Sequence, residues 1–370
     1  MNTKNKISPE IELLICCSRT NVGSKIKDKI LDLVGTDLDW DYLLRIATEH
    51  KLKSLLFHNL NSICPEKIPK NILRDLKNHF NNNARKNLFL MGELIKIVEI
   101  FRLNEINIIP YKGPTLAILA YHNLAFRDFR DLDILINSKD FLAVNNQLIK
   151  LGYNSRINFN VIHCNSFMKL YLKSNREFLY EHLEKNVIIE VHWKIQPLFY
   201  SFSSSKFKQL YNNLIAVPIN GANLMTMSIN DNLLLLCMHA SGHLWDRLSW
   251  SCDILEIIQG NDIEWDCLLV KAKKLGIYRI VLINLVILNE LFDMKFPYII
   301  MENIKSDKMS IILKNKIINS YFDGKPEKSI SNKVYLRFNS RENKSDGFKD
   351  LIRLLIITIY NLLKNLFKYF

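Results

Sequence analysis

Two aspartates separated by one leucine lie inside an apolar run at residues 131–136, DLDILI, and they constrain the fold more than any other feature. In an extended strand, successive side chains point to opposite faces, so Asp131 and Asp133 share one face. Carboxylates held this close repel, and each raises the pKa of the other, unless a positive group lies between them. A divalent metal ion is the usual group of this kind. The run therefore predicts a metal site on a sheet.

Length and composition indicate a globular protein of two or three domains, because the chain has 370 residues and 48% of them are hydrophobic. Its seven cysteines include no CxxC pair, which argues against a disulfide framework or a zinc ribbon and suits a reducing compartment. The first 23 residues lack the apolar core of a signal peptide, so we expect a cytoplasmic protein. The net charge of +13 is spread along the chain, and nucleic acid is not indicated as a partner.

The pattern of apolar residues changes along the chain and predicts an α+β fold, a mixed sheet with flanking helices between helical N- and C-terminal regions. Asp39 and Pro69 are expected helix starts in the first region, and Gly260 and Gly276 are expected helix stops. Helix is expected again directly after Pro218. We divide the chain into a helical domain at 1–105, a catalytic core at 106–220, a helical domain at 221–345, and an amphipathic terminal helix at 346–370.

Strands are expected within the core at 106–111 and 130–136, and the run at 153–159 fits a further strand. Two more runs, LYEHLE and VIIEVHW, are separated as in a hairpin. Alternation in the second of these runs places Glu190 and His192 on one face. A third carboxylate thus approaches Asp131 and Asp133 from another strand.

This layout, a glycine turn before a helix, then Asp-x-Asp, then an acid on a later strand, is the one that metal-dependent nucleotidyl transfer requires. The turn and the helix N-terminus hold a triphosphate, and the Asp pair carries one or two Mg²⁺ ions. Asp131 and Asp133 would bridge the metals, and Glu190 would complete the site of the attacking hydroxyl.

The run YKGPTLAILAYHNLAFRDFRDLDILI resembles the KG…L…Y…R…DxDxLV signature of the uncharacterised nucleotidyltransferases in the DNA polymerase β-like superfamily. The stretches DWDYLLRIATEHKLKSLLFHNL, IIEVHW and LLLLCMHASGHLWDRLSWSCDILEII are similar to other parts of that family. The resemblance implies a polymerase β-like core, a bound NTP, Mg²⁺ with Mn²⁺ as the alternative ion, and transfer of a nucleoside monophosphate with release of pyrophosphate.

Carried over to this sequence, the resemblance implies a phosphate-binding turn, an arginine before the acids, and three acids for metal and catalysis: Lys112 and Gly113, Arg127, and Asp131, Asp133 and Glu190. One departure concerns the turn. The superfamily commonly has Gly-Ser, whereas here Lys112-Gly113 is followed by Pro114, so a lysine charge would replace the serine hydroxyl.

Several of these residues also have a purely structural interpretation. A lone Asp-x-Asp can belong to a solvent-facing edge strand, and Arg127 or Lys112 can serve only as an ion-pair partner of the acids. His192 can contact substrate or metal, orient a ligand, or simply pack beside Trp193. His239 and His243 have a zinc-compatible spacing but lack the glutamate of HExxH, since residue 240 is alanine. We expect both either to line the cleft that faces the predicted site or to lock their helix to it.

The sequence therefore predicts a Mg²⁺-dependent nucleotidyltransferase whose acceptor is a hydroxyl, phosphate or amine on a small molecule, sugar or protein. The alternative is a nucleotide-binding or partner-binding regulatory protein of the same fold without turnover, which the Lys112-Gly113-Pro114 turn motivates.

The terminal helix is open to two interpretations. It packs on the protein itself, or it lies on an anionic membrane surface through Arg353, Lys364 and Lys368.

Overall fold

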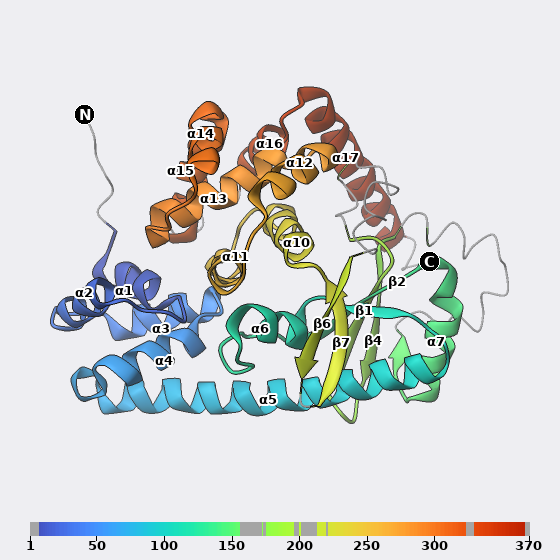
Figure 1. The fold of residues 1–370 in the computed structure, drawn as a ribbon, viewed down its shortest axis with the longest axis horizontal. Coiled ribbons are helices and arrows are strands. Elements are labelled where there is room, and N and C mark those ends of the chain that lie inside the picture. Colours follow the sequence, from blue (N-terminus) through green and yellow to red (C-terminus); the bar gives the residue numbers. More distant parts are fainter. Residues whose placement is uncertain are drawn as a thin grey trace.

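The structure is a computed structural model, and it describes residues 7–155, 172, 175–195, 200, 213–219, 221–322 and 329–366. Helices surround a mixed sheet, so the predicted α+β class is confirmed at this level (Figure 1). Within the described residues, no helix is both long enough and apolar enough to cross a membrane.

The N-terminal part of the chain is helical, as expected. Asp39 caps one helix, because its carboxylate accepts a hydrogen bond from the Tyr42 N–H at 2.8 Å, and Pro69 directly precedes another. Both predicted helix starts are therefore confirmed. The helices are α1 (Pro9–Cys17), α2 (Ser24–Val34), α3 (Trp40–Glu49), α4 (Lys53–Ile63), the short 3-10 helix η1 (Pro65–Lys67) and α5 (Lys70–Leu103), which runs along the bottom of Figure 1.

A five-stranded mixed sheet follows, in the order β1-β2-β5-β4-β3. Only β2 and β5 pair in parallel, and the other neighbours are antiparallel. The predicted strand at 153–159 is present as β3, and residues 156–159 lie outside the described part. The elements are β1 (Ile108–Pro110), α6 (Gly113–Tyr121), β2 (Asp131–Ile136), the 3-10 helix η2 (Ser138–Asp140), α7 (Phe141–Lys150), β3 (Asn154–Ser155), β4 (Glu177–His182) and β5 (Val187–His192).

A second, two-stranded sheet corrects the expectation of helix directly after Pro218. Strands β6 (Leu214–Ile219) and β7 (Ala222–Met227) form a hairpin in which Pro218 pairs with Asn223. Gly221, with φ +82°, lies in the connecting turn. Proline has no N–H and is rare inside sheets, but β6 belongs to a two-stranded sheet and has a free edge that tolerates it.

The C-terminal part is helical from residue 229 onward. The periodic stretch around residue 244 is two helices, because Leu244 and Trp245 have φ values of 56° and 51° and end the first one. The expected stops at Gly260 and Gly276 are confirmed. The helices are α10 (Ile229–Gly242), α11 (Leu248–Gly260), α12 (Trp265–Leu275), α13 (Tyr278–Phe292), α14 (Tyr298–Ser306), α15 (Lys308–Phe322), α16 (Ile330–Asn339) and α17 (Lys344–Leu366).

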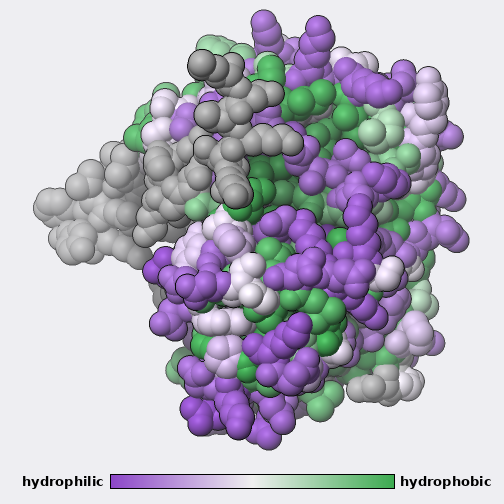
Figure 2. Space-filling model, turned by 90° about the vertical axis from the view of Figure 1, so that its left-hand side faces the viewer, coloured by the Kyte–Doolittle hydropathy of each residue, from purple (hydrophilic) through white to green (hydrophobic). Residues whose placement is uncertain are grey.

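The helices of both regions and the sheet share one buried apolar core. In Figure 1, α10 and α11 lie between α6 and the outer helices α12 to α17. On the face shown in Figure 2, hydrophilic residues form much of the surface and apolar residues gather in groups between them. The core therefore holds α10 and α11 against the part of the chain that carries the predicted site.

The terminal helix α17 contacts the protein through part of its surface. Arg353 donates a hydrogen bond to the Tyr200 carbonyl at 2.9 Å, and Asp350 is buried. Leu355 and Ile356, in contrast, are about 60% exposed (60% and 59%). Self-packing is thus observed at Arg353, and membrane contact through the apolar face stays a prediction.

Candidate active site

The register of the sheet brings the predicted acids together. Asp133 on β2 lies opposite Glu190 on the neighbouring β5, and His192 on β5 lies opposite Glu177 on β4. Because side chains alternate along a strand, Asp131 shares the face of Asp133, and these residues all project from one side of the sheet. Glu177 was missed because the expected strand began two residues too late. The alternation of EFLYEH was the signal that could have identified it.

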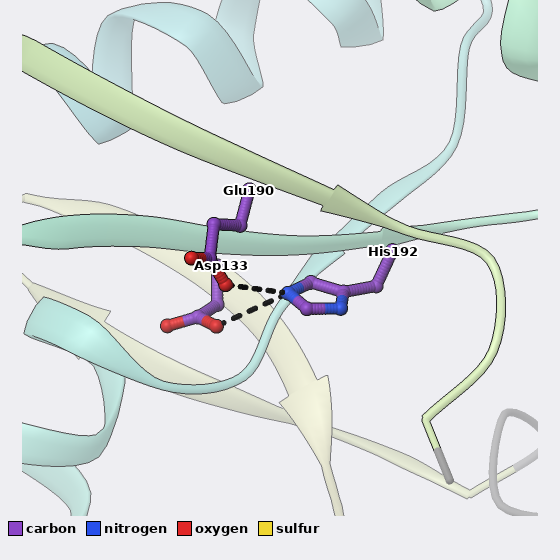
Figure 3. A group of neighbouring side chains, drawn as sticks. All are labelled: Asp133, Glu190 and His192. Carbon is purple, nitrogen blue, oxygen red and sulfur yellow. Dashed lines mark hydrogen bonds and ion pairs between the residues drawn. The ribbon is translucent and has the colours of Figure 1, made fainter. Parts of the chain in front are cut away.

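His192 lies at the centre of this cluster. Its Nε2 is 3.2 Å from Asp133 Oδ1 and 3.3 Å from Glu190 Oε2, and its Nδ1 is 3.2 Å from Glu177 Oε2. Figure 3 shows the Asp133 and Glu190 carboxylates turned toward the same ring nitrogen. Burial disfavours the imidazolium, but hydrogen bonds to the three carboxylates outweigh burial and raise the pKa of His192 to about 10. The carboxylates therefore surround a point where positive charge is stabilised.

The two aspartates differ in their environments. Burial acts to raise the pKa of Asp133, but the Lys112 ammonium, which donates to Asp133 Oδ1 at 3.1 Å, and His192 hold that pKa well below its usual range. For Asp131, burial and then the charges of Asp133 and Glu190 raise the pKa. The predicted repulsion thus destabilises the ionised form of Asp131. An additional cation near this carboxylate would relieve the repulsion.

Gly113 is required by the close approach of its turn to β2. Its φ is +51°, and a Cβ at this position would lie 2.9 Å from the Asp131 carbonyl oxygen. Real Cβ atoms essentially never come that close to another heavy atom. The turn therefore packs directly on the start of the strand that carries both aspartates, and Lys112 beside it reaches Asp133.

We predict that Gly113→Ala destabilises the protein by about 2 kcal/mol or more, because a Cβ adds left-handed strain and a backbone contact. The matched control is Gly92→Ala in the middle of α5. A Cβ there meets nothing within 4 Å, and the change should stabilise by up to about 1 kcal/mol. Urea unfolding midpoints measure both changes. Equal stability of the Gly113→Ala and wild-type proteins would contradict this account of the turn.

Arg127 binds a carboxylate that no local sequence pattern predicted as its partner. Its guanidinium binds Asp253 on α11 through two hydrogen bonds of 2.9 and 3.0 Å, and the Tyr121 hydroxyl donates to the same carboxylate at 2.8 Å. The Arg127 pKa is raised, since the charge of Asp253 outweighs the desolvation of the guanidinium. Arg127 therefore joins the loop before β2 to the C-terminal helices, and a nucleotide contact stays a prediction for it.

A cavity of about 320 Å³ opens beside these groups. Acids from the sheet lie in its wall together with side chains from both helical regions, so the site is enclosed by parts of the chain far apart in sequence. Besides Asp131, Asp133, Glu177 and Glu190, its lining includes Lys112, Arg127, Lys51, Arg176, Arg247 and Trp250. Lys51, Arg176, Arg247 and Trp250 are, like Glu177, among the lining residues that sequence reasoning missed, since no local pattern distinguishes these four.

His239 and His243 on α10 lie in the wall of this cavity and of a second one, of about 220 Å³, beside it. Their rings are 4.6 Å apart, and both pack against Trp250. Burial and then the Lys112 charge lower the pKa of His243 to about 4, and the pKa of His239 is also well below its usual value. Both imidazoles are therefore neutral near pH 7.

A metal ion fits the cluster at the sheet. Ligand atoms of Asp133, Glu190 and His192 all lie within 4.8 Å of one another, and they form the metal-capable group found among the described residues. Carboxylate oxygens together with an imidazole nitrogen suit a divalent cation, which would displace the proton that the carboxylates stabilise on His192. Asp131 lines the same cavity but does not belong to this group, and neither do His239 and His243. The metal roles of Asp131, Asp133 and Glu190 stay predictions.

A sequence profile described as "Uncharacterised nucleotidyltransferase" matches residues 36–293. The match spans well over half of the chain, and it includes the predicted site residues together with α10 and α11. No curated protein matches the sequence.

Proposed function

The chain belongs to the uncharacterised nucleotidyltransferase family, and from that membership we propose a Mg²⁺-dependent enzyme that moves a nucleoside monophosphate from an NTP to an acceptor. The acceptor group is a hydroxyl, phosphate or amine, and pyrophosphate is released. We further propose that the mixed sheet is a polymerase β-like core. The observation that supports the activity best is the convergence of Asp131, Asp133 and Glu190 from two neighbouring strands on one cavity.

In the proposed reaction, a bond forms between the acceptor atom and the α-phosphorus while the bond to the pyrophosphate oxygen breaks. Mg²⁺ bound by the acids would neutralise the triphosphate charge and stabilise the entering and leaving oxygens. Glu190 is 28% exposed, whereas Asp133 is 4% exposed, so Glu190 is the carboxylate that an incoming acceptor can reach. We therefore propose that Glu190 accepts the proton that the acceptor group loses. Lys112 faces the charge of the phosphates.

A regulatory protein that binds nucleotide without turnover is the second candidate. The Lys112–Asp133 ion pair favours it, because the lysine that replaces the usual serine neutralises one of the proposed metal-binding carboxylates. Binding of an NTP would then be retained while transfer is lost.

The test compares NTP binding with and without Mg²⁺ for the wild type and for Asp131→Ala plus Asp133→Ala. We expect metal-dependent binding by the wild type only, because the double variant loses both carboxylates of β2. Equal, metal-independent binding by both proteins would remove the basis of the proposal. Incubation with labelled NTP and candidate acceptors separates the two functions. Tight binding without pyrophosphate release for all four NTPs would favour the regulatory protein.

A further inference from the structure

Lys51 lies in the left-handed region that favours glycine, with φ 57°. It follows α3, and the hydrogen bonds from the N–H groups of Lys51 and Leu52 to Thr48 and Ala47 close a helix C-terminal motif. A residue with a Cβ costs about 1 kcal/mol more than glycine at this position. The lysine therefore stands where the backbone alone prefers glycine, which suggests a use for its side chain.

That side chain lines the acid-bearing cavity. The part of the chain that the structure describes provides no hydrogen-bond or ion-pair partner for the Lys51 ammonium group. Burial and then the positive charge of Arg247 lower the pKa of Lys51, and the charges of Asp128 and Asp131 oppose this shift without reversing it. An anion bound in the cavity would neutralise the positive charges of Lys51 and Arg247.

Arg247 enters the cavity wall from the opposite helical region, directly before α11. Among the described residues, Asp246 provides the carboxylate that pairs with it, at 3.9 Å from its Nε, and its guanidinium lies over the Trp250 ring at 5.6 Å from the centroid. It follows the turn at Leu244 and Trp245, two bulky residues that both have left-handed backbone conformations. The strained turn before α11 therefore also places a weakly paired cation at the cavity.

His50 links the two backbone segments that carry Lys51 and Arg247. Its Nδ1 accepts a hydrogen bond from the Leu248 N–H at 3.1 Å, and its Nε2 lies 3.0 Å from the Tyr321 carbonyl. The neutral ring with the proton on Nε2 satisfies both contacts, and burial lowers its pKa, which favours that form. His50 directly precedes Lys51, and Leu248 directly follows Arg247. The buried His50 ring therefore fixes the backbone next to both cations.

We infer that Lys51 and Arg247 form a cationic clamp that binds a phosphate or polyphosphate group in the cavity shared with Asp131 and Asp133. The inference rests on the proposed function, since a nucleotidyltransferase brings polyphosphate to those acids. The bound group is either the terminal part of the NTP or a phosphate carried by the acceptor. In both cases the helical regions, and not only the sheet, select the substrate.

Lys51→Gly is the most informative variant, because it removes the charge while it relieves the backbone strain. It should fold at least as well as wild type and bind pyrophosphate about tenfold more weakly or worse, with AMP binding unchanged. If the clamp holds the NTP, the Mg²⁺ complex of α,β-methylene ATP should be weakened to a similar extent. Arg247→Gln should have the same effect on binding. Glu105→Gly is the backbone control, with φ 58° on an exposed residue, and Lys77→Gln on the exposed surface of α5 is the charge control.

Calorimetric titrations with the ATP analogue and with pyrophosphate identify the source of the phosphate. If pyrophosphate competes with the analogue and both bind more weakly to Lys51→Gly, the clamp holds the NTP. If pyrophosphate binds alongside the analogue and only pyrophosphate binding weakens, the clamp holds an acceptor phosphate. Folded variants that bind both probes like wild type, or a wild type that binds neither, would overturn the inference. Pyrophosphate binding that depends on Lys51, without metal-dependent NTP binding, would instead refute only the proposed function.

Discussion

Asp133→Asn is expected to lower the rate of nucleotidyl transfer by about a thousandfold, equivalent to about 4 kcal/mol of transition-state stabilisation. Asp133 is 4% exposed and pairs with both Lys112 and His192. A neutral amide of the same shape holds a divalent cation more weakly than a carboxylate does, and it no longer neutralises the charges of Lys112 and His192. Initial rates of pyrophosphate release at saturating NTP and Mg²⁺ measure the effect.

The matched control is Glu181→Gln. Glu181 lies on β4 with the same alternation as Glu177, but it is not part of the cavity lining. The Glu181→Gln protein should retain the wild-type rate of nucleotidyl transfer. Circular dichroism shows whether Asp133→Asn is folded, and the His192 pKa, followed by NMR, should fall because one of its carboxylate partners is gone. A folded Asp133→Asn protein that works within about threefold of wild type would exclude Asp133 from the chemistry.

Arg127→Met is expected to cost about 3–5 kcal/mol of stability, because it leaves the Asp253 carboxylate buried without its cation. Asp253 is 3% exposed, and Tyr121 is its other partner. A single neutral hydroxyl does not replace a guanidinium bound through two hydrogen bonds. Urea unfolding at pH 7 measures the loss.

Two further variants test the reason for that loss. Arg102→Met removes an ion pair with Glu99 whose side chains are 67% and 53% exposed, and it should leave the urea unfolding midpoint close to that of wild type. Asp253→Leu combined with Arg127→Met should be more stable than Arg127→Met alone, because no unpaired charge remains buried. If the exposed and buried arginine variants lost equal stability, the pairing of Arg127 with Asp253 could not explain the effect.

Local patterns predicted a large part of the fold. The alternation at residues 131–136 and in VIIEVHW predicted two strands, with Asp131 and Asp133 on one face of the first and Glu190 and His192 on one face of the second, since the period of a strand is set by the backbone. Asp39 and Gly276 marked helix ends for equally local reasons, a side-chain cap and a left-handed turn. These local patterns did not predict the hairpin β6–β7, whose first strand contains Pro218, a residue that weakens any strand prediction.

The family resemblance, the α+β class and the types of residue that form the candidate site could all be predicted from the amino-acid pattern, because they depend on spacing over a few residues. Two findings required the folded structure: Arg127 binds Asp253, and Lys51 and Arg247, 196 positions apart in number, share one cavity. Such contacts depend on how helices distant in the chain pack on one core, and no local period encodes that packing. For the same reason the structure, and not the motif, shows that three carboxylates surround His192.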